Sequence, residues 1–479
     1  MKNTIIISSF LALLCTGCTS DDINTDPNVA YTMAPEPLIT YAEKELSDYM
    51  NTPSVNENNF RLTMQYWQEV TYVSESNYDF TSRNISNNIW VDTYVNVLNN
   101  LNKAKELVEQ YQPEPSELNA WPAKKQNQLA IIDILMVYTF QVLTDTFGDI
   151  PYTQALNQDQ YPLPVYDDDA QIYDSLINRL KTDVNKLQEG EGSFGAGDIL
   201  YGGDIGKWKK FGNSILLKLG IAISDSNPAL AQSCINMAIT GGLITGQSQN
   251  AIFRYQAETP NFNPLFENLA NSGRNDFFGG KPFIDFLNTT SDPRRTSYFQ
   301  DVNGTYIGQE IGLPGVFTNF SAPGIFAYIP VTPGNLITHT EVAFYLAEAA
   351  ARFGIGGSPE ALYKNAVRAS FMEWGYSEQE AQDYISDNPY NAANWKKSIG
   401  EQAWVAMYNQ PVTSWNFYRR LDYPLLQAPP TAIANAGGKV PVRLQYPTLE
   451  ATTNGTNYAK AAAAIGGDKL TTKVFWDIH

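Results

Sequence analysis

Apolar residues recur at helical spacing through most of the chain, so helices are its main predicted element. Within residues 86–111, for example, Ile89, Val97, Leu101 and Val108 fall near one face of a helix. The same spacing predicts helices over about residues 122–147, 207–224, 228–240, 341–353, 360–374 and 399–408. The segment 122–147 is the most apolar, but Asp133, Gln141 and Asp145 interrupt it, which favours a buried core helix over a membrane span.

Three predicted helices, one of them after the acidic run 167–169, have recognisable starts. Asn227-Pro228 is typical of a cap followed by the first helical residue. Thr338 and Glu341 match a capping box. The acidic run 167–169 suggests either a metal site or a helix N-terminus. We favour the helix, because an apolar series follows the run and carboxylates interact favourably with the positive end of a helix.

The segment from about residue 250 to 336 has a different texture. Gly and Pro are frequent, and aromatic residues lie irregularly among Asn, Thr and Ser. We expect loops here, with one helix near Gly280 to Leu287 and a few short strands. Asp301-x-Asn303-Gly304 is a fragment of a calcium loop without its remaining ligands, so a turn is the better interpretation. Loops on a rigid scaffold are where binding residues usually sit.

Two of the predicted helices form a hairpin that resembles a tetratricopeptide repeat unit. Gly356-Gly357-Ser358-Pro359 turns the chain between residues 341–353 and 360–374. Small residues allow the two helices to approach closely: Ala347, Ala350, Ala361, Ala366 and Ala369. The pair 207–224 and 228–240 looks like a degenerate second copy. The predicted fold is therefore mainly α, a tetratricopeptide-like helix-pair scaffold with a loop-rich region and a few short strands.

The N-terminus has the features of an export signal. Lys2 precedes a short apolar run from Ile5 to Leu14, too short to span a bilayer. The small residues before Cys18 resemble a bacterial lipobox, and the acidic residues after it resemble the signal that sends Bacteroidetes lipoproteins to the cell surface. We expect residues 1–17 to be a signal peptide and 18–40 a lipid-anchored tether. Residues 41–479 then form a single domain that includes the loop-rich insertion 250–336.

Composition restricts the partners. The formal net charge of −18 argues against nucleic acid, which requires a basic surface. It also argues against electrostatic attachment to anionic lipid, so acyl chains at Cys18 would hold the protein on the membrane. The chain has three cysteines, and Cys234 is best explained as a small buried residue. The sequence holds 28 Tyr and 9 Trp, and exposed rings of these types are what a sugar-binding surface requires.

Residues for catalysis are largely missing. His339 and His479 are the two histidines, which excludes histidine-rich zinc sites. The sequence has no nucleophile elbow, phosphate-binding loop or dinucleotide fingerprint. We expect no catalytic residues, no metal and no cofactor. Glycoside hydrolysis stays open as an alternative, because it needs only two carboxylates and the chain has 50 Asp and Glu.

Several stretches, in order along the chain, resemble the SusD/RagB family of Bacteroidetes outer-membrane nutrient-binding lipoproteins, especially its SusD-like branch. They are residues 23–28 (INTDPN), 145–152 (DTFGDIPY), 203–219 (GDIGKWKKFGNSILLKL), 340–350 (TEVAFYLAEAA), 415–424 (WNFYRRLDYP) and 466–477 (GGDKLTTKVFWD). Each stretch alone is weak, but together they cover nearly the whole chain. The motif residues themselves look structural, and we expect Trp208 and Trp415 in the core.

The resemblance implies a helical lid on the extracellular mouth of a SusC-like TonB-dependent barrel, which captures oligosaccharides or, in some members, peptides. By position in the family, ligand residues would lie in two stretches. These candidates are Tyr72, Tyr78, Phe80, Arg83 and Asn84 in the first, and Asn275, Asp276, Phe277, Phe278 and Phe320 in the second. Exposed rings would stack on the apolar face of a sugar while polar groups bind its hydroxyls. Peptide cargo stays open, and a surface glycoside hydrolase is the third possibility.

Overall fold

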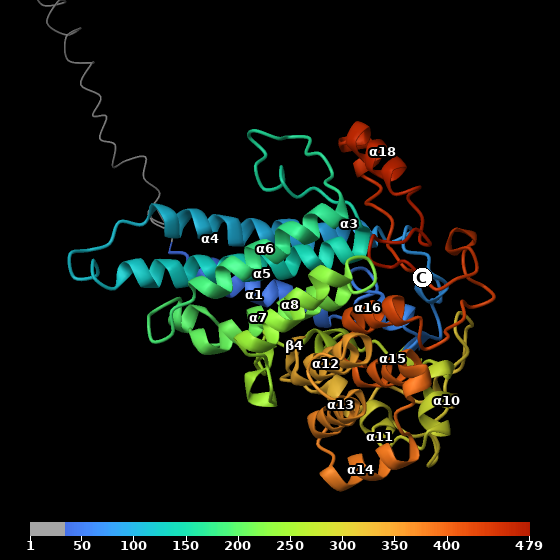
Figure 1. The fold of residues 1–479 in the computed structure, drawn as a ribbon. Coiled ribbons are helices and arrows are strands. Elements are labelled where there is room, and N and C mark those ends of the chain that lie inside the picture. The colour runs from blue at the N-terminus through green and yellow to red at the C-terminus, as the bar shows by residue number, and fades with distance from the viewer. Residues whose placement is uncertain (1–33) are drawn as a thin grey trace, which may run out of the picture.

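A computed structural model describes residues 34–479, and helices make up most of it (Figure 1). The longer helices are α1 (Glu36–Asn51), α4 (Asn99–Gln110), α5 (Trp121–Phe147), α6 (Asp169–Lys186), α7 (Ile205–Ala222), α8 (Pro228–Gly241), α10 (Lys281–Thr289), α12 (His339–Phe353), α13 (Pro359–Glu373), α14 (Glu378–Asp387), α15 (Trp395–Ala406), α16 (Pro411–Leu421) and α18 (Gly455–Ala464). Short helices are α2 (Phe60–Thr63), α3 (Ile85–Trp90), α9 (Pro264–Phe266), α11 (Arg295–Tyr298) and α17 (Glu450–Thr453). The predicted signal peptide and Cys18 lie outside the described residues.

The strands of the described region are short and form two antiparallel pairs. The strands are β1 (Trp67–Glu69), β2 (Ala251–Phe253), β3 (Phe277–Gly279) and β4 (Gly334–Ile337), with β1 paired to β3 and β2 to β4. Three of them and α10 lie in the region predicted to be loop-rich, which agrees with the sequence. Asp301 to Gly304 forms a turn, because the Gly304 N–H donates to Asp301 Oδ1 at 2.7 Å. The prediction of a mainly α fold is confirmed.

Both predicted helix pairs are present. α12 packs against α13 and α7 against α8, and α12 also contacts α7, so the two pairs form one scaffold. Ala347 and Ala366 are fully buried. Ala361, in the first turn of α13, is exposed, so it does not contribute to the close approach of the two helices. Between α7 and α8 the small residue is Gly220, where an added Cβ would lie 2.9 Å from the Cβ of the buried Cys234.

α5 is the central helix, and its neighbours bury almost all of it. By length and apolar composition it is the one helix of the described chain that could cross a membrane, yet 89% of its most apolar window is buried inside the protein. α4, α6 and α7 pack around it, and Figure 1 shows them side by side along its length. The core-helix prediction is confirmed.

The helix starts agree with the sequence in all but one contact. Asp168 and Asn227 accept N–H bonds from the first turns of α6 and α8. Thr338 accepts from Glu341 N, but the reciprocal bond of a capping box is missing. Glu341 turns inward instead, where its carboxylate contacts Lys218 Nζ at 3.2 Å and accepts from Gln410 Nε2 at 2.8 Å.

The sequence placed other boundaries wrongly. The tether was expected to reach residue 40, but α1 begins at Glu36 and buries Ile39 completely. α14, α16 and α18 were not predicted. The helix expected over 86–111 is present, with a π-helical segment Val91–Leu98 between α3 and α4.

Three of the quoted sequence stretches meet at one buried carboxylate, Asp145. It accepts hydrogen bonds from Tyr173 Oη (2.5 Å), Asn416 Nδ2 (2.7 Å) and Trp476 Nε1 (2.9 Å). We call this set, with Arg419, the Asp145 hub. Arg419 donates to the Asp145 carbonyl, and its guanidinium lies 3.5 Å from the centre of the Trp415 ring.

The hub holds α5 and α6 against α16 and the C-terminal segment. Trp208 and Trp415 are fully buried, as predicted. Trp208, Trp415 and the residues of the hub therefore stabilise the fold.

Candidate functional site

The two stretches predicted to bind ligand are joined by the β1–β3 pair. Trp67 lies opposite Gly279, and Glu69 lies opposite Phe277. Beyond the strand, Val70 N donates to the Asp276 carbonyl at 2.9 Å, and Gly315 N donates to the Val70 carbonyl at 3.0 Å. The loop that follows β1 and the loop before α10 are thus held together, although about 200 residues separate them in sequence.

Half of the ten candidates are buried. The five are Tyr78, Phe80, Asp276, Phe277 and Phe278, with exposed fractions of 0%, 5%, 7%, 3% and 5%. Their side chains lie inside the protein, so the four rings cannot stack on a sugar at the surface, and the Asp276 carboxylate pairs with Arg274. Tyr78, for example, adopts a left-handed conformation with a φ of 67° and accepts a hydrogen bond from Gln65 Nε2. These five residues shape the loops.

The other five candidates reach solvent to different extents. Tyr72 is 66% exposed, and Asn84 and Asn275 are exposed. Arg83 is half-buried, and it forms an ion pair with the buried Glu75. Phe320 is half-buried, with its ring edge-on to Phe278.

The sequence analysis missed an apolar loop beside these residues. Leu313, Val316 and Phe317 are 40%, 59% and 44% exposed. Phe317 packs on Phe278 with ring centres 6.2 Å apart. The run Val316-Phe317-Thr318-Asn319-Phe320 has the same mixture of aromatic and small polar residues that drew attention to Phe320, so it could have been found. We call Tyr72, Leu313, Val316, Phe317 and Phe320 the aromatic surface.

An ionic network lies beside the buried Phe277 ring of β3. Arg274 Nη2 lies 3.0 Å from Glu69 Oε1, and Arg274 Nε lies 2.5 Å from Asp276 Oδ1. Its guanidinium also covers the Phe277 ring at 4.1 Å. Burial raises the pKa of the Glu69 carboxyl to about 8; repulsion from Glu75 adds to the rise, and Arg274 opposes it. Arg274 thus connects β1 to the start of β3.

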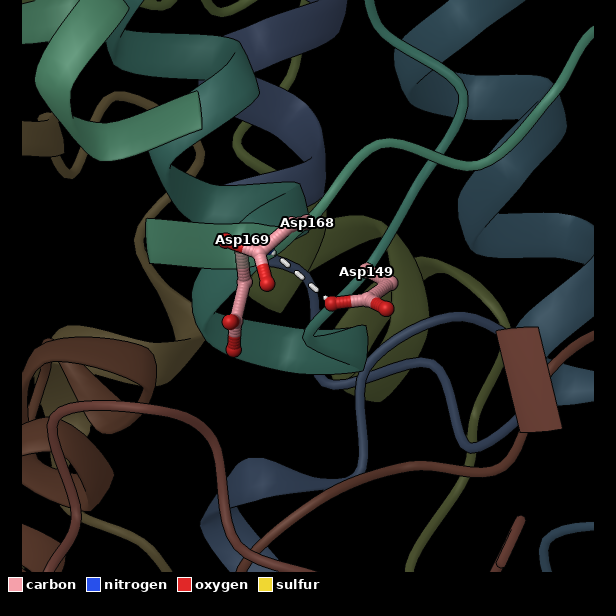
Figure 2. A group of neighbouring side chains, drawn as sticks. All are labelled: Asp149, Asp168 and Asp169. Carbon is pink, nitrogen blue, oxygen red and sulfur yellow. Dashed lines mark hydrogen bonds between the residues drawn. The ribbon is translucent and has the colours of Figure 1, made fainter. Parts of the chain in front are cut away.

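The acidic run that suggested a metal is a helix N-terminus. Asp149, Asp168 and Asp169 each bring a carboxylate oxygen within 4.8 Å of the other two (Figure 2). Each of these carboxylates accepts a backbone N–H, donated by Asp169, Gln171 and Phe475 respectively. Burial raises the pKa of Asp149 to about 6 and of Asp169 to about 7, which weakens them as anionic ligands. Asp168 caps α6, as the sequence indicated, and backbone N–H groups account for the positions of the other two carboxylates.

Comparison with known proteins decides the family. A family model described as starch-binding, associating with the outer membrane, matches residues 27–447. The chain belongs to the SusD-like family. The resemblance noted in the sequence is confirmed, and with it the association of the family with the outer membrane. Comparison with curated proteins finds no match.

Solved structures of SusD-like proteins share the fold over nearly the whole chain. A chitin-binding protein is 26% identical, with a TM-score of 0.80 over 93% of this chain and 100% of its own. A SusD homologue from Bacteroides uniformis is 25% identical, with a TM-score of 0.77 over 92% and 99%. A chitin-binding SusD homologue from Flavobacterium johnsoniae is 22% identical, with a TM-score of 0.75 over 92% and 98%; at this identity the likeness shows the fold alone.

Proposed function

We propose that this SusD-like protein binds a glycan at the cell surface and delivers it to a SusC-like TonB-dependent transporter. The family description as starch-binding and outer-membrane associated supports the glycan and the location. The similarity to a chitin-binding protein at 26% identity supports a polysaccharide fragment as cargo. The transporter follows from the family resemblance, and the scaffold of helix pairs offers the broad face that such a partner would contact.

The aromatic surface is the observation that carries the proposal. Tyr72 and Phe317 are large rings with much of their area in solvent, and such exposed rings favour contact with the apolar face of a pyranose. Asn84 and Asn275 lie nearby in the sequence, and their exposed amides provide donors and acceptors for the hydroxyl groups of the sugar. Because backbone bonds tie the two loops together, these groups are positioned before ligand arrives, which reduces the entropy lost on binding.

Removing the rings is expected to abolish most of the glycan affinity. Tyr72→Ala and Phe317→Ala should each weaken binding by about tenfold, since an exposed ring that anchors a ligand contributes ~1–2 kcal/mol. Calorimetric titration of the purified chain with chitin oligosaccharides and with malto-oligosaccharides would measure this. Tyr41→Ala is the matched control, because that ring on α1 is also partly exposed, at 42%. Unchanged affinity in both variants would contradict the aromatic surface.

Two alternatives give different results in the same assays. Peptide cargo predicts signals on a peptide array and none on a glycan array. A surface glycoside hydrolase predicts release of reducing sugar from the bound polysaccharide, whereas we expect the ligand to be recovered intact.

We further propose that acyl chains at Cys18 hold the protein on the outer membrane. The lipobox-like residues before Cys18 support this, and a chain with a net charge of −18 has little attraction to anionic lipid. Cys18→Ala should abolish incorporation of a labelled fatty acid and release the protein from the membrane fraction. Cys234→Ala is the control, because that thiol is buried in α8. Labelling that survives in Cys18→Ala would contradict the anchor.

A further inference from the structure

A cavity of about 600 Å³ lies among α6, α7 and α8, far along the chain from the loops of the aromatic surface. Figure 1 shows these three helices together, whereas α10, which directly follows β3, lies at the lower right. None of the cavity's lining residues belongs to the aromatic surface. The volume falls in the range of about 300–1,000 Å³ that is usual for small-molecule sites.

The cavity is locally basic on a strongly acidic protein. Four lysines line it, together with Glu189 and Asp204. The lysines are Lys181, Lys207, Lys209 and Lys210. Glu189 is engaged by Lys209, with Oε1 and Nζ 3.1 Å apart, and Asp204 caps α7 by accepting the Lys207 N–H.

The other three lysines leave positive charge in the cavity. Within residues 34–479 no carboxylate lies within 4 Å of the Nζ of Lys181, Lys207 or Lys210. The chain as a whole carries −18. A concave surface of one sign concentrates ligands of the other sign, so this cavity favours an anion.

A buried amide in the cavity wall lacks a partner. Asn213 is 3% exposed, and its Nδ2 has no hydrogen-bond acceptor among residues 34–479. Gly241 leaves the space this amide occupies, because an added Cβ would lie 2.6 Å from Nδ2. Nδ2 is closed off from solvent in this conformation, so the amide would have to rotate toward the cavity to donate to a ligand oxygen. That rotation would be favourable with ligand bound, because a buried donor without an acceptor is unfavourable. Val184, Leu216 and Met237 complete the lining with apolar groups that suit one face of a ring.

We propose that this cavity is a second binding site, for a sugar residue that carries a carboxylate, such as a uronic acid. The ammonium groups of Lys181, Lys207 and Lys210 would bind the carboxylate. The Asn213 amide would bind a ring or hydroxyl oxygen, and the apolar side chains would contact the ring. The site is distinct from the aromatic surface, so the protein would recognise an acidic unit separately from the glycan at its loops.

Calorimetric titration of the full chain with glucuronate tests the site. We expect a dissociation constant on the order of 0.1–1 mM at low salt, weaker at about 0.5 M NaCl, where charges are screened within a few Å. Lys207→Gln/Lys210→Gln should weaken binding by about tenfold or more, and Asn213→Ala by a smaller factor. Lys364→Gln/Lys397→Gln is the matched control, because neither lysine lines the cavity: Lys364 pairs with Glu360 within α13, and Lys397 pairs with Glu401 within α15.

Three results would overturn the proposal. Glucose binding as tightly as glucuronate would show that charge is not recognised. Inorganic sulfate binding as tightly would show attraction of any anion. Equal glucuronate affinity in wild type and Lys207→Gln/Lys210→Gln would place the ligand elsewhere. Tyr72→Ala is expected to retain glucuronate binding, so failure of this site and failure of the aromatic surface are distinguishable.

Discussion

Replacing Asp145 by alanine is expected to lower the free energy of unfolding by about 3–5 kcal/mol, because three buried donors lose their acceptor and the buried Arg419 loses an opposing charge. Asp145 is 1% exposed and accepts from Tyr173, Asn416 and Trp476. Arg419 is also 1% exposed; burial lowers the pKa of its guanidinium to about 10, and Asp145 is the first of the carboxylates that oppose this shift. Without Asp145 the α5–α16 junction loses its central acceptor.

Chemical denaturation of the purified chain would measure this loss. Asp159→Ala is the control, because that side chain is exposed in a loop, and its effect should stay within about 0.5 kcal/mol. In Asp145→Asn the side chain keeps its shape and one acceptor oxygen, so this variant should lose less stability than Asp145→Ala. Below its unfolding temperature the variant should bind glycan as the wild type does. A loss under about 1 kcal/mol for Asp145→Ala would mean that the hub does not stabilise the fold.

The sequence predicted helices well where an apolar face or a cap defined them, as in α5, α7, α12 and α13. It failed for α16, because two arginines of that helix are buried. Arg419 and Arg420 are 1% and 3% exposed, and Arg420 is bound by the buried Glu348 through two hydrogen bonds of 2.8 Å. Polar residues that are buried through such pairing do not follow apolar periodicity, so a helix rich in them looks like a loop in the sequence.

The candidate site was predicted only in part. Sequence resemblance located the two stretches, but the strands that join them are three residues long, too short for an alternating pattern to be recognised. The exposure of each ring could not be predicted either. Phe277 and Phe278 are neighbours on β3, and both are buried because Trp67 packs on one and Phe317 on the other. Burial of both faces of β3 depends on loops that come together only in the folded protein.

Arg274→Ala is expected to destabilise the protein by roughly 2–4 kcal/mol at alkaline pH and by less near pH 6. Arg274 is the cation that opposes the raised pKa of Glu69, so its removal raises that pKa further above 8. When the pKa of a carboxyl is higher in the folded state than in the unfolded state, the folded protein loses stability as the pH rises. The loss begins at the usual pKa of the carboxyl, 4.5, and ends above its folded pKa. The wild-type chain therefore loses this contribution between about pH 4.5 and about 8, and the variant continues to lose it above pH 8.

Urea denaturation would give the difference in unfolding free energy between wild type and Arg274→Ala at about pH 6 and again at about pH 9.5. We expect the larger difference at the higher pH. Arg254→Ala is the matched control, because that arginine is exposed and forms no ion pair with any residue from 34 to 479. A double-mutant cycle isolates the cause: in Glu69→Gln, which cannot ionise, the effect of Arg274→Ala should no longer depend on pH. Equal differences at the two pH values in the presence of Glu69 would show that Arg274 does not hold β1 and β3 together through this carboxylate. The proposed ligand loops would then depend on the backbone pairing and on contacts that do not involve the Glu69 charge, such as the packing of Trp67 on Phe277.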